Sequence, residues 1–278
     1  MSEPSASKTA VAVLTMRAAH QLLDGVPKVL TDPVAPLLLS DDERAALNSP
    51  ERFATPIARG LRAHVVARSR YAEERLQDAV ARGIEQLVVL GAGLDSFAYR
   101  QPAWARTLRI FEVDHPASQA DKRARLAGAG ITPPPNLRWA PIDFEQTRLG
   151  EGLVRAGWAA DRLTFFTCLG VLVYLTEDAI DELFGFVGTL PRGSEIAFTI
   201  SGDYREIATS TQLASAAAAG GEPWLSLLTA EQVVPRLRGL GFAAAHVESE
   251  EAIAQRYFVG RQDGLSAPRH ARIGHAVV

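Results

Sequence analysis

Gln86-Leu-Val-Val-Leu-Gly-Ala-Gly-Leu-Asp95 decides the fold of this chain, because a continuous apolar run ends abruptly in Gly-x-Gly and then an acid. Such a run is typical of a strand that is buried on both faces of a parallel sheet. Gly91 and Gly93 would let the chain turn sharply at the end of that strand, and a ligand could lie against bare backbone there. The motif predicts a nucleotide-type site, although two glycines also serve an ordinary strand-to-helix turn.

A second short apolar strand, Arg109-Ile-Phe-Glu-Val-Asp114, also ends in an acid. In doubly wound sheets an acid roughly 20 residues after the first glycine accepts hydrogen bonds from ribose hydroxyls, which makes Asp114 the ribose candidate. The third glycine of the dinucleotide fingerprint is missing, since Ser96 and Phe97 stand in its place. Bulk there opposes a pyrophosphate, which needs close backbone approach. The pattern favours a nucleoside cofactor without phosphates, such as S-adenosylmethionine.

Composition narrows the function classes. The chain has 278 residues, of which 47% are hydrophobic and 22% charged, and this is typical of a globular protein. With a net charge of −3 and no basic stripe, no nucleic-acid partner is expected. The single cysteine, Cys168, leaves no internal disulfide, and no metal site is expected. No signal-like start and no membrane-length apolar stretch is found, so we expect a cytoplasmic protein without a membrane partner.

Apolar runs alternate with helical patterns along the chain. The patterns predict helices at 9–24 and 62–83, a short helix that begins at Asp41, and strands at 86–90, 108–113, 137–142, 163–169, 194–201, 242–248 and 256–261. This alternation predicts a mostly parallel sheet with helices on both faces. Only residues 249–255 separate the last two strands, so that pair should be antiparallel. Seven strands in this layout indicate an α/β class I methyltransferase fold.

Two regions do not belong to this sheet. Residues 1–75 form a predicted helical N-terminal extension that caps an α/β domain at 76–278, and residues 202–228 form an insertion after the fifth strand. Loops beyond the carboxyl ends of strands line the sites of such sheets, so we expect both regions to cover a substrate pocket. Tyr204 and Trp224 in the insertion are candidate aromatic walls of that pocket, with core packing as the alternative.

Further motifs, in this order along nearly the whole chain, carry a family resemblance. The chain resembles the leucine carboxyl methyltransferase superfamily at Thr9-Ala10, Met16-Arg-Ala18, Asp32-Pro-Val-Ala35, Arg68-Ser-Arg-Tyr71, Leu90-Gly-Ala-Gly-Leu-Asp95, Phe111-Glu-Val-Asp-His-Pro116, Lys122, Ile142-Asp-Phe144 and Val173-Tyr-Leu-Thr176. The bacterial branch of that superfamily includes S-adenosylmethionine-dependent methyltransferases and polyketide O-methyltransferases. The resemblance implies S-adenosylmethionine as the cofactor.

The resemblance also implies roles for individual residues. Arg68 would bind the methionine carboxylate, and Gly91 with Gly93 would offer backbone to the methionine or ribose end. Asp114 would bind the ribose, and Asp143 with Phe144 would read the adenine. Such roles suit the chemistry, because a guanidinium fork matches a carboxylate and an Asp accepts from an exocyclic amine. The alternatives are that Arg68 is a surface charge and that Asp143 caps the following segment.

The chain departs from the family at Leu169-Gly170, where relatives commonly have Glu-Gly or Glu-Cys with the acid facing the cationic end of the cofactor. Loss of an opposite charge beside a cation weakens binding or alters the electrostatics of the pocket. Asp95 is a neighbouring acid that could replace it.

Methyl transfer from a sulfonium is an in-line displacement that needs no metal. A carboxylate acceptor needs no base, whereas a phenol needs one. His115, beside Asp114, is the histidine nearest the site in sequence, and it is either a base or a structural residue. The leading hypothesis is an O-methyltransferase that acts on a small-molecule hydroxyl or carboxylate in secondary metabolism. Two alternatives remain: a non-methylating cofactor-binding protein or cyclase, which Leu169 keeps open, and a protein carboxyl methyltransferase.

Overall fold

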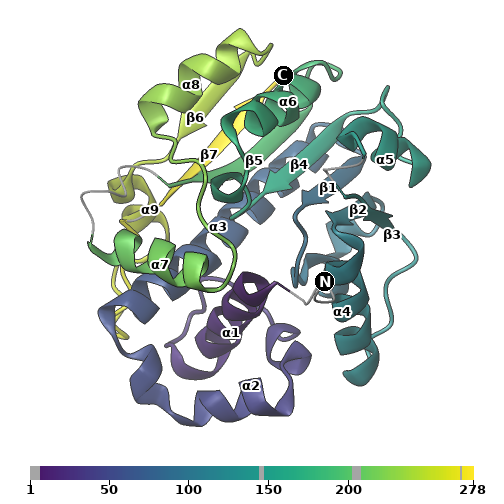
Figure 1. The fold of residues 1–278 in the computed structure, drawn as a ribbon. Helices are drawn as coiled ribbons and strands as arrows, with labels where there is room; N and C mark the ends of the chain where they lie inside the picture. The colour runs from purple at the N-terminus through teal and green to yellow at the C-terminus, as the bar shows by residue number, and fades with distance from the viewer. Residues whose placement is uncertain (1–6, 144–146, 202–207, 270) are drawn as a thin grey trace.

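The structure, a computed structural model, describes residues 7–143, 147–201, 208–269 and 271–278. Its centre is a seven-stranded sheet in the order β3-β2-β1-β4-β5-β7-β6, with helices on both sides (Figure 1). The strands are β1 Gln86–Leu90, β2 Arg109–Asp114, β3 Leu137–Pro141, β4 Thr164–Cys168, β5 Glu195–Ile200, β6 Ala244–Val247 and β7 Arg272–Val277. Strands β1 to β5 pair in parallel, and β7 runs antiparallel to both of its neighbours. This is the predicted class I methyltransferase fold.

The α-helices of the described residues are α1 Lys8–Leu23, α2 Asp41–Ala45, α3 Pro56–Ala81, α4 Pro116–Gly128, α5 Leu149–Arg155, α6 Glu177–Gly188, α7 Ala208–Ala219, α8 Ala230–Gly239 and α9 Glu250–Tyr257. The predicted helices at 9–24 and at Asp41 are confirmed, and the latter begins with a capping box of Ser40 and Glu43. Helix α3 begins before the expected Arg62, because Thr55 caps it and Pro56 suits its first turn. None of these helices is long and apolar enough to cross a membrane.

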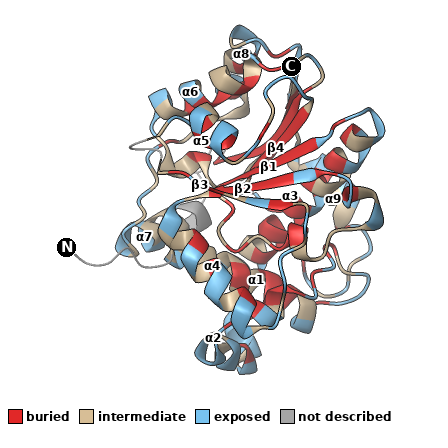
Figure 2. Ribbon diagram, turned by 90° about the vertical axis from the view of Figure 1, so that its right-hand side faces the viewer, coloured by how far each residue is buried: buried red, intermediate tan, exposed pale blue. Residues whose placement is uncertain are grey.

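Strand β1 is apolar throughout because both of its faces are covered. Val88 and Leu90 pack in a cluster with residues of α5, α6 and α8, whereas Leu87 and Val89 pack in a second cluster with α3. The strands in the middle of the sheet are accordingly buried along most of their length (Figure 2). The two clusters hold the carboxyl ends of β1, β2 and β4 rigidly at one edge of the sheet.

The predicted strand at 256–261 is wrong, because this segment begins in the last turn of α9. Ser249 Oγ caps that helix by accepting a hydrogen bond from Ala252 N at 3.1 Å. Ile253 and Phe258 are buried in a cluster with residues of α3. Ala254 and Tyr257 pack partly buried against the same cluster, and with Ile253 they recur at spacings of three and four residues, which is the period of a helix face rather than the alternation of a strand. The last strand is β7, which runs antiparallel to β6 although the connection between them contains α9.

The sequence pattern did not predict strand β7, because two of its residues, Gly274 and His275, suit a strand only through their contacts with β5. A Cβ atom on Gly274 would lie 2.4 Å from Cζ of Phe198, so the aromatic ring of β5 takes the place of a side chain. His275 Nε2 lies 2.8 Å from Oε2 of the buried Glu195. A glycine and a histidine interrupt the apolar pattern from which strands are predicted.

The N-terminal helices are joined to the glycine motif by buried ion pairs. Arg17 of α1 places Nη2 2.6 Å from Asp32 Oδ2 and donates from the same nitrogen to Ser96 Oγ at 2.6 Å. Ser96 in turn donates to Asp32 at 2.7 Å. Because Ser96 follows the glycines of β1, the position of α1 and the shape of that turn depend on each other. The predicted boundary after residue 75 lies inside α3, which runs unbroken to Ala81.

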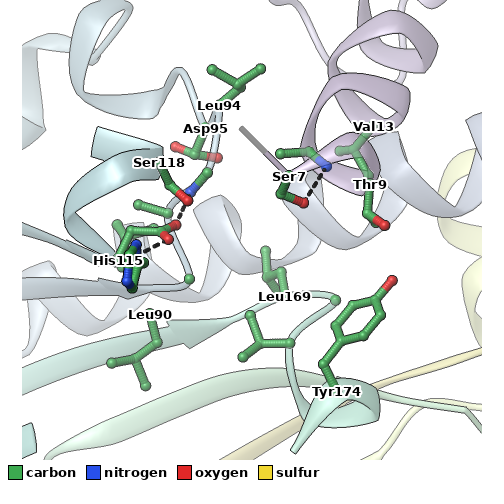
Figure 3. A pocket seen from close by; sticks show the side chains of 18 of the residues that line it. Ser7, Thr9, Val13, Leu90, Leu94, Asp95, His115, Ser118, Leu169 and Tyr174 are labelled. Carbon is green, nitrogen blue, oxygen red and sulfur yellow. Dashed lines mark hydrogen bonds between the residues drawn. The ribbon is translucent and has the colours of Figure 1, made fainter. Parts of the chain in front are cut away.

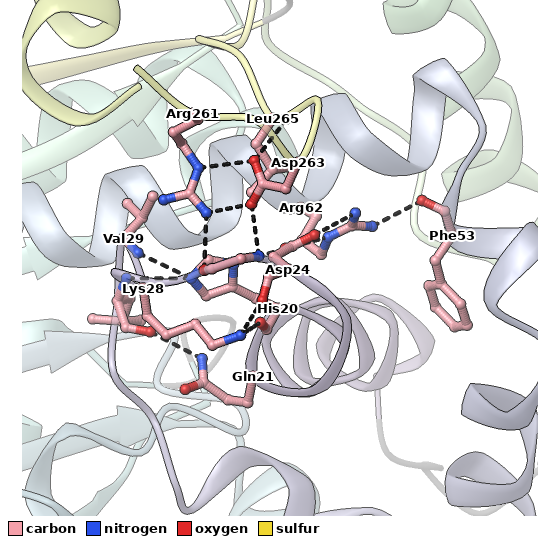
Figure 4. Close-up of polar contacts among 12 residues, drawn as sticks. His20, Gln21, Asp24, Lys28, Val29, Phe53, Arg62, Arg261, Asp263 and Leu265 are labelled. Carbon is pink, nitrogen blue, oxygen red and sulfur yellow. Dashed lines mark hydrogen bonds and ion pairs between the residues drawn. The ribbon is translucent and has the colours of Figure 1, made fainter. Parts of the chain in front are cut away.

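A second buried cluster joins α1 to α3 (Figure 4). Asp24 accepts from Arg62 Nε at 2.7 Å and from Arg62 Nη2 at 2.9 Å. The His20 ring lies between Asp24, at 2.7 Å from Nδ1, and the backbone N–H of Val29, which donates to Nε2 at 3.1 Å. Since Nε2 accepts a hydrogen bond, the ring is neutral with its proton on Nδ1. The cluster fixes α1 against the helix that carries Arg68.

Candidate active site

A cavity of about 650 Å³ opens at the carboxyl ends of β1, β2 and β4. Figure 3 shows Asp95 and His115 on one side of it and Thr9, Val13 and Tyr174 on the other, so α1 closes the cavity opposite the glycine motif. The described residues that were predicted to bind the cofactor all line it: Arg68, Gly91, Gly93, Asp95, Asp114, Asp143 and Leu169. Phe144 lies outside the described residues.

Steric constraints explain why both positions of the motif are glycine. Gly91 and Gly93 adopt φ values of +59° and +43°, which side chains other than glycine rarely tolerate. A Cβ atom on Gly91 would also lie 2.4 Å from Cγ2 of Val171 in the loop after β4. Residues 91–108 contain only 3₁₀ turns, and Phe97 is buried. Without an α-helix in this segment, no helix N-terminus faces the turn to hold a pyrophosphate.

Asp114 is held in place by the backbone around it. Its Oδ2 accepts from Gly93 N at 2.6 Å, and its Oδ1 accepts from His115 N at 2.7 Å. An ionised carboxylate has about four acceptor sites, so each oxygen can accept one more hydrogen bond. The carboxylate lines the cavity and can therefore accept from both hydroxyls of a ribose.

Arg68 is a buried cation that faces the cavity. Burial, and next the charge of Arg17, lower the pKa of its guanidinium to about 10. It makes no ion pair or hydrogen bond with any residue that the structure describes. A Cβ atom on Gly170 would lie 2.6 Å from Arg68 Nη1, so the guanidinium rests against the chain just after β4. A buried guanidinium without an anion is costly, and the carboxylate of a methionine moiety would supply one.

Leu169 places an apolar side chain in the cavity where the family resemblance implies an acid. Leu169 is half-buried and packs against the cluster between the sheet and α3. Asp95, the proposed substitute, accepts from Phe97 N at 2.8 Å and lies 3.4 Å from Arg17 Nη1, so another cation already faces its charge.

Glu222 is a lining acid that sequence reasoning missed. Its Oε2 accepts from Thr9 N at 3.1 Å in the first turn of α1. It belongs to the insertion after β5. No local sequence pattern around Glu222 predicts a contact with α1, which is far away in the sequence. Arg17 was missed as well, although it stands within the quoted motif Met16-Arg-Ala18.

His115, the candidate base, begins a helix. Its Nδ1 accepts from Ala117 N at 3.2 Å and so caps α4, and the residue is exposed. It lines the cavity beside Asp114. The structural interpretation of this histidine accounts for its position better than a role as a base.

A second cavity of about 230 Å³ adjoins the first. The two cavities share Thr9, Val13, Arg68, Gly170 and Tyr174. The second one extends between α1, α3, the end of β5 and α7, and most of its lining is apolar.

The insertion after β5 contributes to this second cavity. Trp224 lines it, whereas Tyr204 lies outside the described residues. Leu225 N donates to Val173 O at 2.7 Å, which fixes the end of the insertion against the loop after β4. His64, one of the six histidines of the chain that are candidates for a base, also lines the second cavity.

The sheet order and the nucleoside-type cavity define a class I methyltransferase. The family model of leucine carboxyl methyltransferase matches residues 10–188. A Bacillus subtilis protein named "Putative S-adenosyl-L-methionine-dependent methyltransferase YktD" is 35% identical over 240 residues, which are 83% of this chain and 78% of that protein. A Mycobacterium avium protein described in the same terms is 35% identical over 204 residues, 70% of this chain and 64% of its own length.

Among solved structures, a DUF574 family protein from Streptomyces avermitilis has the same fold, with a TM-score of 0.57 at 16% identity over 95% of this chain and 96% of its own. The chain belongs to the leucine carboxyl methyltransferase family. It is an S-adenosylmethionine-dependent methyltransferase, so the expected fold, enzyme class and cofactor are confirmed.

Proposed function

We propose that this chain transfers the methyl group of S-adenosylmethionine to an oxygen of a small molecule, either a hydroxyl or a carboxylate. The observation that carries the proposal is the pair of connected cavities. The larger one offers groups for a nucleoside and a carboxylate, and the smaller one offers a mainly apolar chamber behind Gly170. An apolar chamber with a few polar groups is typical of a site for a small molecule.

When bound, S-adenosylmethionine supplies a methyl group on a positively charged sulfur. Arg68 would hold its carboxylate, and Asp114 would hold its ribose. Both anchors line the larger cavity together with Leu169 and Gly170, and Gly170 also lines the smaller cavity. Holding both reactants in line converts the transfer to an effectively unimolecular step, and apolar walls keep water from the reacting atoms.

A hydroxyl acceptor would also need a base. His64 precedes Arg68 by one turn of α3, so the two side chains lie on the same face of that helix. His64 is buried and lines the smaller cavity, where His115 is not found. We therefore assign the base for a hydroxyl acceptor to His64, whereas a carboxylate acceptor would need none.

Substitution of Arg68 tests the cofactor half of the proposal. Arg68→Ala should weaken the binding of S-adenosylhomocysteine by about ten- to hundredfold, because a hydrogen bond to a charged group contributes about 1.5–3 kcal/mol. Isothermal titration calorimetry measures this affinity. Arg70→Ala is the matched control on the same helix, since Arg70 is exposed and Glu74 is its ion-pair partner among the described residues. Equal affinities of both variants and the wild type would remove Arg68 from the site.

A methyl-transfer assay tests the acceptor half. Radiolabelled S-adenosylmethionine is incubated with phenols, aromatic and aliphatic carboxylic acids, and a peptide with a free C-terminal leucine. We expect O-methylated small molecules and no methylated peptide. Methylation of the peptide alone would favour the carboxyl methylation of proteins, after which the family is named.

Leu169 supports one alternative function. With an apolar side chain where the family resemblance implies an acid, the chain would bind the cofactor without methylating an acceptor. Tight binding of S-adenosylhomocysteine together with no product from any acceptor would favour this alternative.

A further inference from the structure

The smaller cavity has walls that differ in kind. On one side, α7 presents Leu213, Ala216 and Ala217, and Gly220 follows directly after the helix; the four recur at the spacing of one helix face. These residues are mostly small, so the side of the chamber formed by α7 carries few long side chains. The opposite wall belongs to α3 and to the end of β5.

Apart from Arg68, which faces both cavities, Ser201 is the buried polar residue of this chamber whose side chain lacks a partner among the described residues. Ser201 follows β5 and is only 3% exposed, yet its Oγ makes no hydrogen bond with any residue that the structure describes. A buried hydroxyl without a partner costs free energy, which a ligand that bonds to it would recover. Thr199, two residues earlier, differs because its Oγ1 accepts from Gly170 N at 2.7 Å.

We propose that the acceptor is a compound with a single ring and a second hydrogen-bonding group, and that Ser201 Oγ binds this second group. The proposal rests on the function proposed above and specifies the acceptor class of the same site.

The size of the chamber supports a single ring. A cavity of about 150 Å³ holds benzene, so 230 Å³ holds by proportion about nine or ten non-hydrogen atoms. That is one ring with its substituents. An acceptor with three fused rings exceeds this volume.

The position of Ser201 specifies where the second group lies. The reacting oxygen must lie near Gly170 and Tyr174, where the two cavities meet. Thr199 contacts Gly170, and an extended chain advances about 3.3 Å per residue, so Ser201 lies roughly 7 Å further along the wall. A group across the ring from the reacting oxygen spans a distance of this order. The second group is therefore expected opposite the methylated oxygen.

Binding to the complex with S-adenosylhomocysteine tests this without requiring turnover. The probes are 4-hydroxybenzyl alcohol and 4-ethylphenol, which differ only by a hydroxyl in place of a methyl. Calorimetry should show that Ser201→Ala weakens binding of the alcohol about five- to tenfold and leaves that of 4-ethylphenol unchanged. Ser215→Ala, on the exposed side of α7, is the control and should change neither affinity.

A second variant tests the chamber itself. Ala217→Leu should weaken both probes at least about tenfold by filling the space, whereas Ala218→Leu, which points away from the cavity, should not. The affinity for S-adenosylhomocysteine shows that each variant is folded. The proposal is overturned if neither probe binds the wild type, if Ser201→Ala affects both probes alike, or if 1-hydroxyanthraquinone binds as tightly as the alcohol.

These outcomes separate the two proposals. If the probes bind as expected and no O-methylated product forms from any acceptor, the proposed function fails and the assignment of the chamber stands. If product forms only from acceptors with three or more rings, the proposed function stands and the single-ring assignment fails.

Discussion

Asp114 holds the turn after β1 and offers the same carboxylate to a ligand. Its two oxygens accept the N–H groups of Gly93 and His115, so the charge is oriented before any cofactor arrives. An orientation prepared in this way lowers the entropy cost of binding. At the scale of single residues, the site is thus built from side chains that the backbone already holds.

Asp114→Ala should lower the affinity for S-adenosylhomocysteine at least about tenfold, because two hydrogen bonds to a charged group contribute about 1.5–3 kcal/mol each. Calorimetry measures the loss, and circular dichroism confirms the fold. His115→Asn is the matched control, since asparagine also caps a helix and should leave both the affinity and the turnover nearly unchanged. A large fall in turnover for this control would restore His115 as a base.

At the scale of elements, α1 and α3 act as one unit because a buried charge cluster joins them. Asp24 is the only carboxylate that Arg62 contacts among the described residues, and both side chains are almost fully buried. Asp24→Asn should destabilise the protein by about 3–5 kcal/mol, the cost of a buried charge whose partner is removed. Urea unfolding measures the change.

The matched control for that substitution is Asp78→Asn at the other end of α3. Asp78 pairs with Arg75 at 2.9 Å but is half exposed, so its loss should cost no more than about 1 kcal/mol. Equal effects of the two substitutions would show that the cluster at Asp24 does not fasten α1 to α3.

At the scale of the whole molecule, buried carboxyl groups predict how stability depends on pH. Burial raises the pKa of Glu112 to about 7, even with Lys122 Nζ at 2.7 Å. Because the folded pKa lies above the unfolded value of about 4.3, the stabilisation is complete below that value and is lost as pH rises through 7. Stability should therefore increase as pH falls from 8 to 5.

In acid, stability should instead decrease as the pH falls. Burial by itself raises the pKa of Asp32, but the charges of Arg17 and Arg100 outweigh it and lower that pKa below its ordinary value. A depressed pKa gives stability that is present above the unfolded value and lost as pH falls through the folded one, so stability should decline below about pH 4. Urea midpoints from pH 3 to 8 should pass through a maximum near pH 5, and Glu112→Gln should remove the slope above it. A wild-type midpoint that rises from pH 5 to 8 would contradict this.

The cofactor half of the site could be predicted from the sequence because its residues stand at the ends of apolar strands. Parallel strands bring their carboxyl ends to one edge, so Gly91 and Asp114 had to lie together once β1 and β2 were recognised. Arg68 and Asp143 came from the family resemblance and line the same cavity. Periodicity and strand order therefore sufficed to predict that Gly91 and Asp114 lie together.

Only the tertiary structure decided the rest. Gly274 and His275 of β7 are explained by Phe198 and Glu195 on the neighbouring strand, and no local pattern contains those partners. Likewise, Ser201 becomes a candidate for ligand binding only because α7 encloses it and leaves its hydroxyl without a bond. The sequence by itself determined the sheet edge and the cofactor motif, which follow from local periodicity. The last strand and the acceptor chamber depend on contacts between segments far apart in the chain, so their burial and hydrogen bonding are settled only when the whole fold is formed.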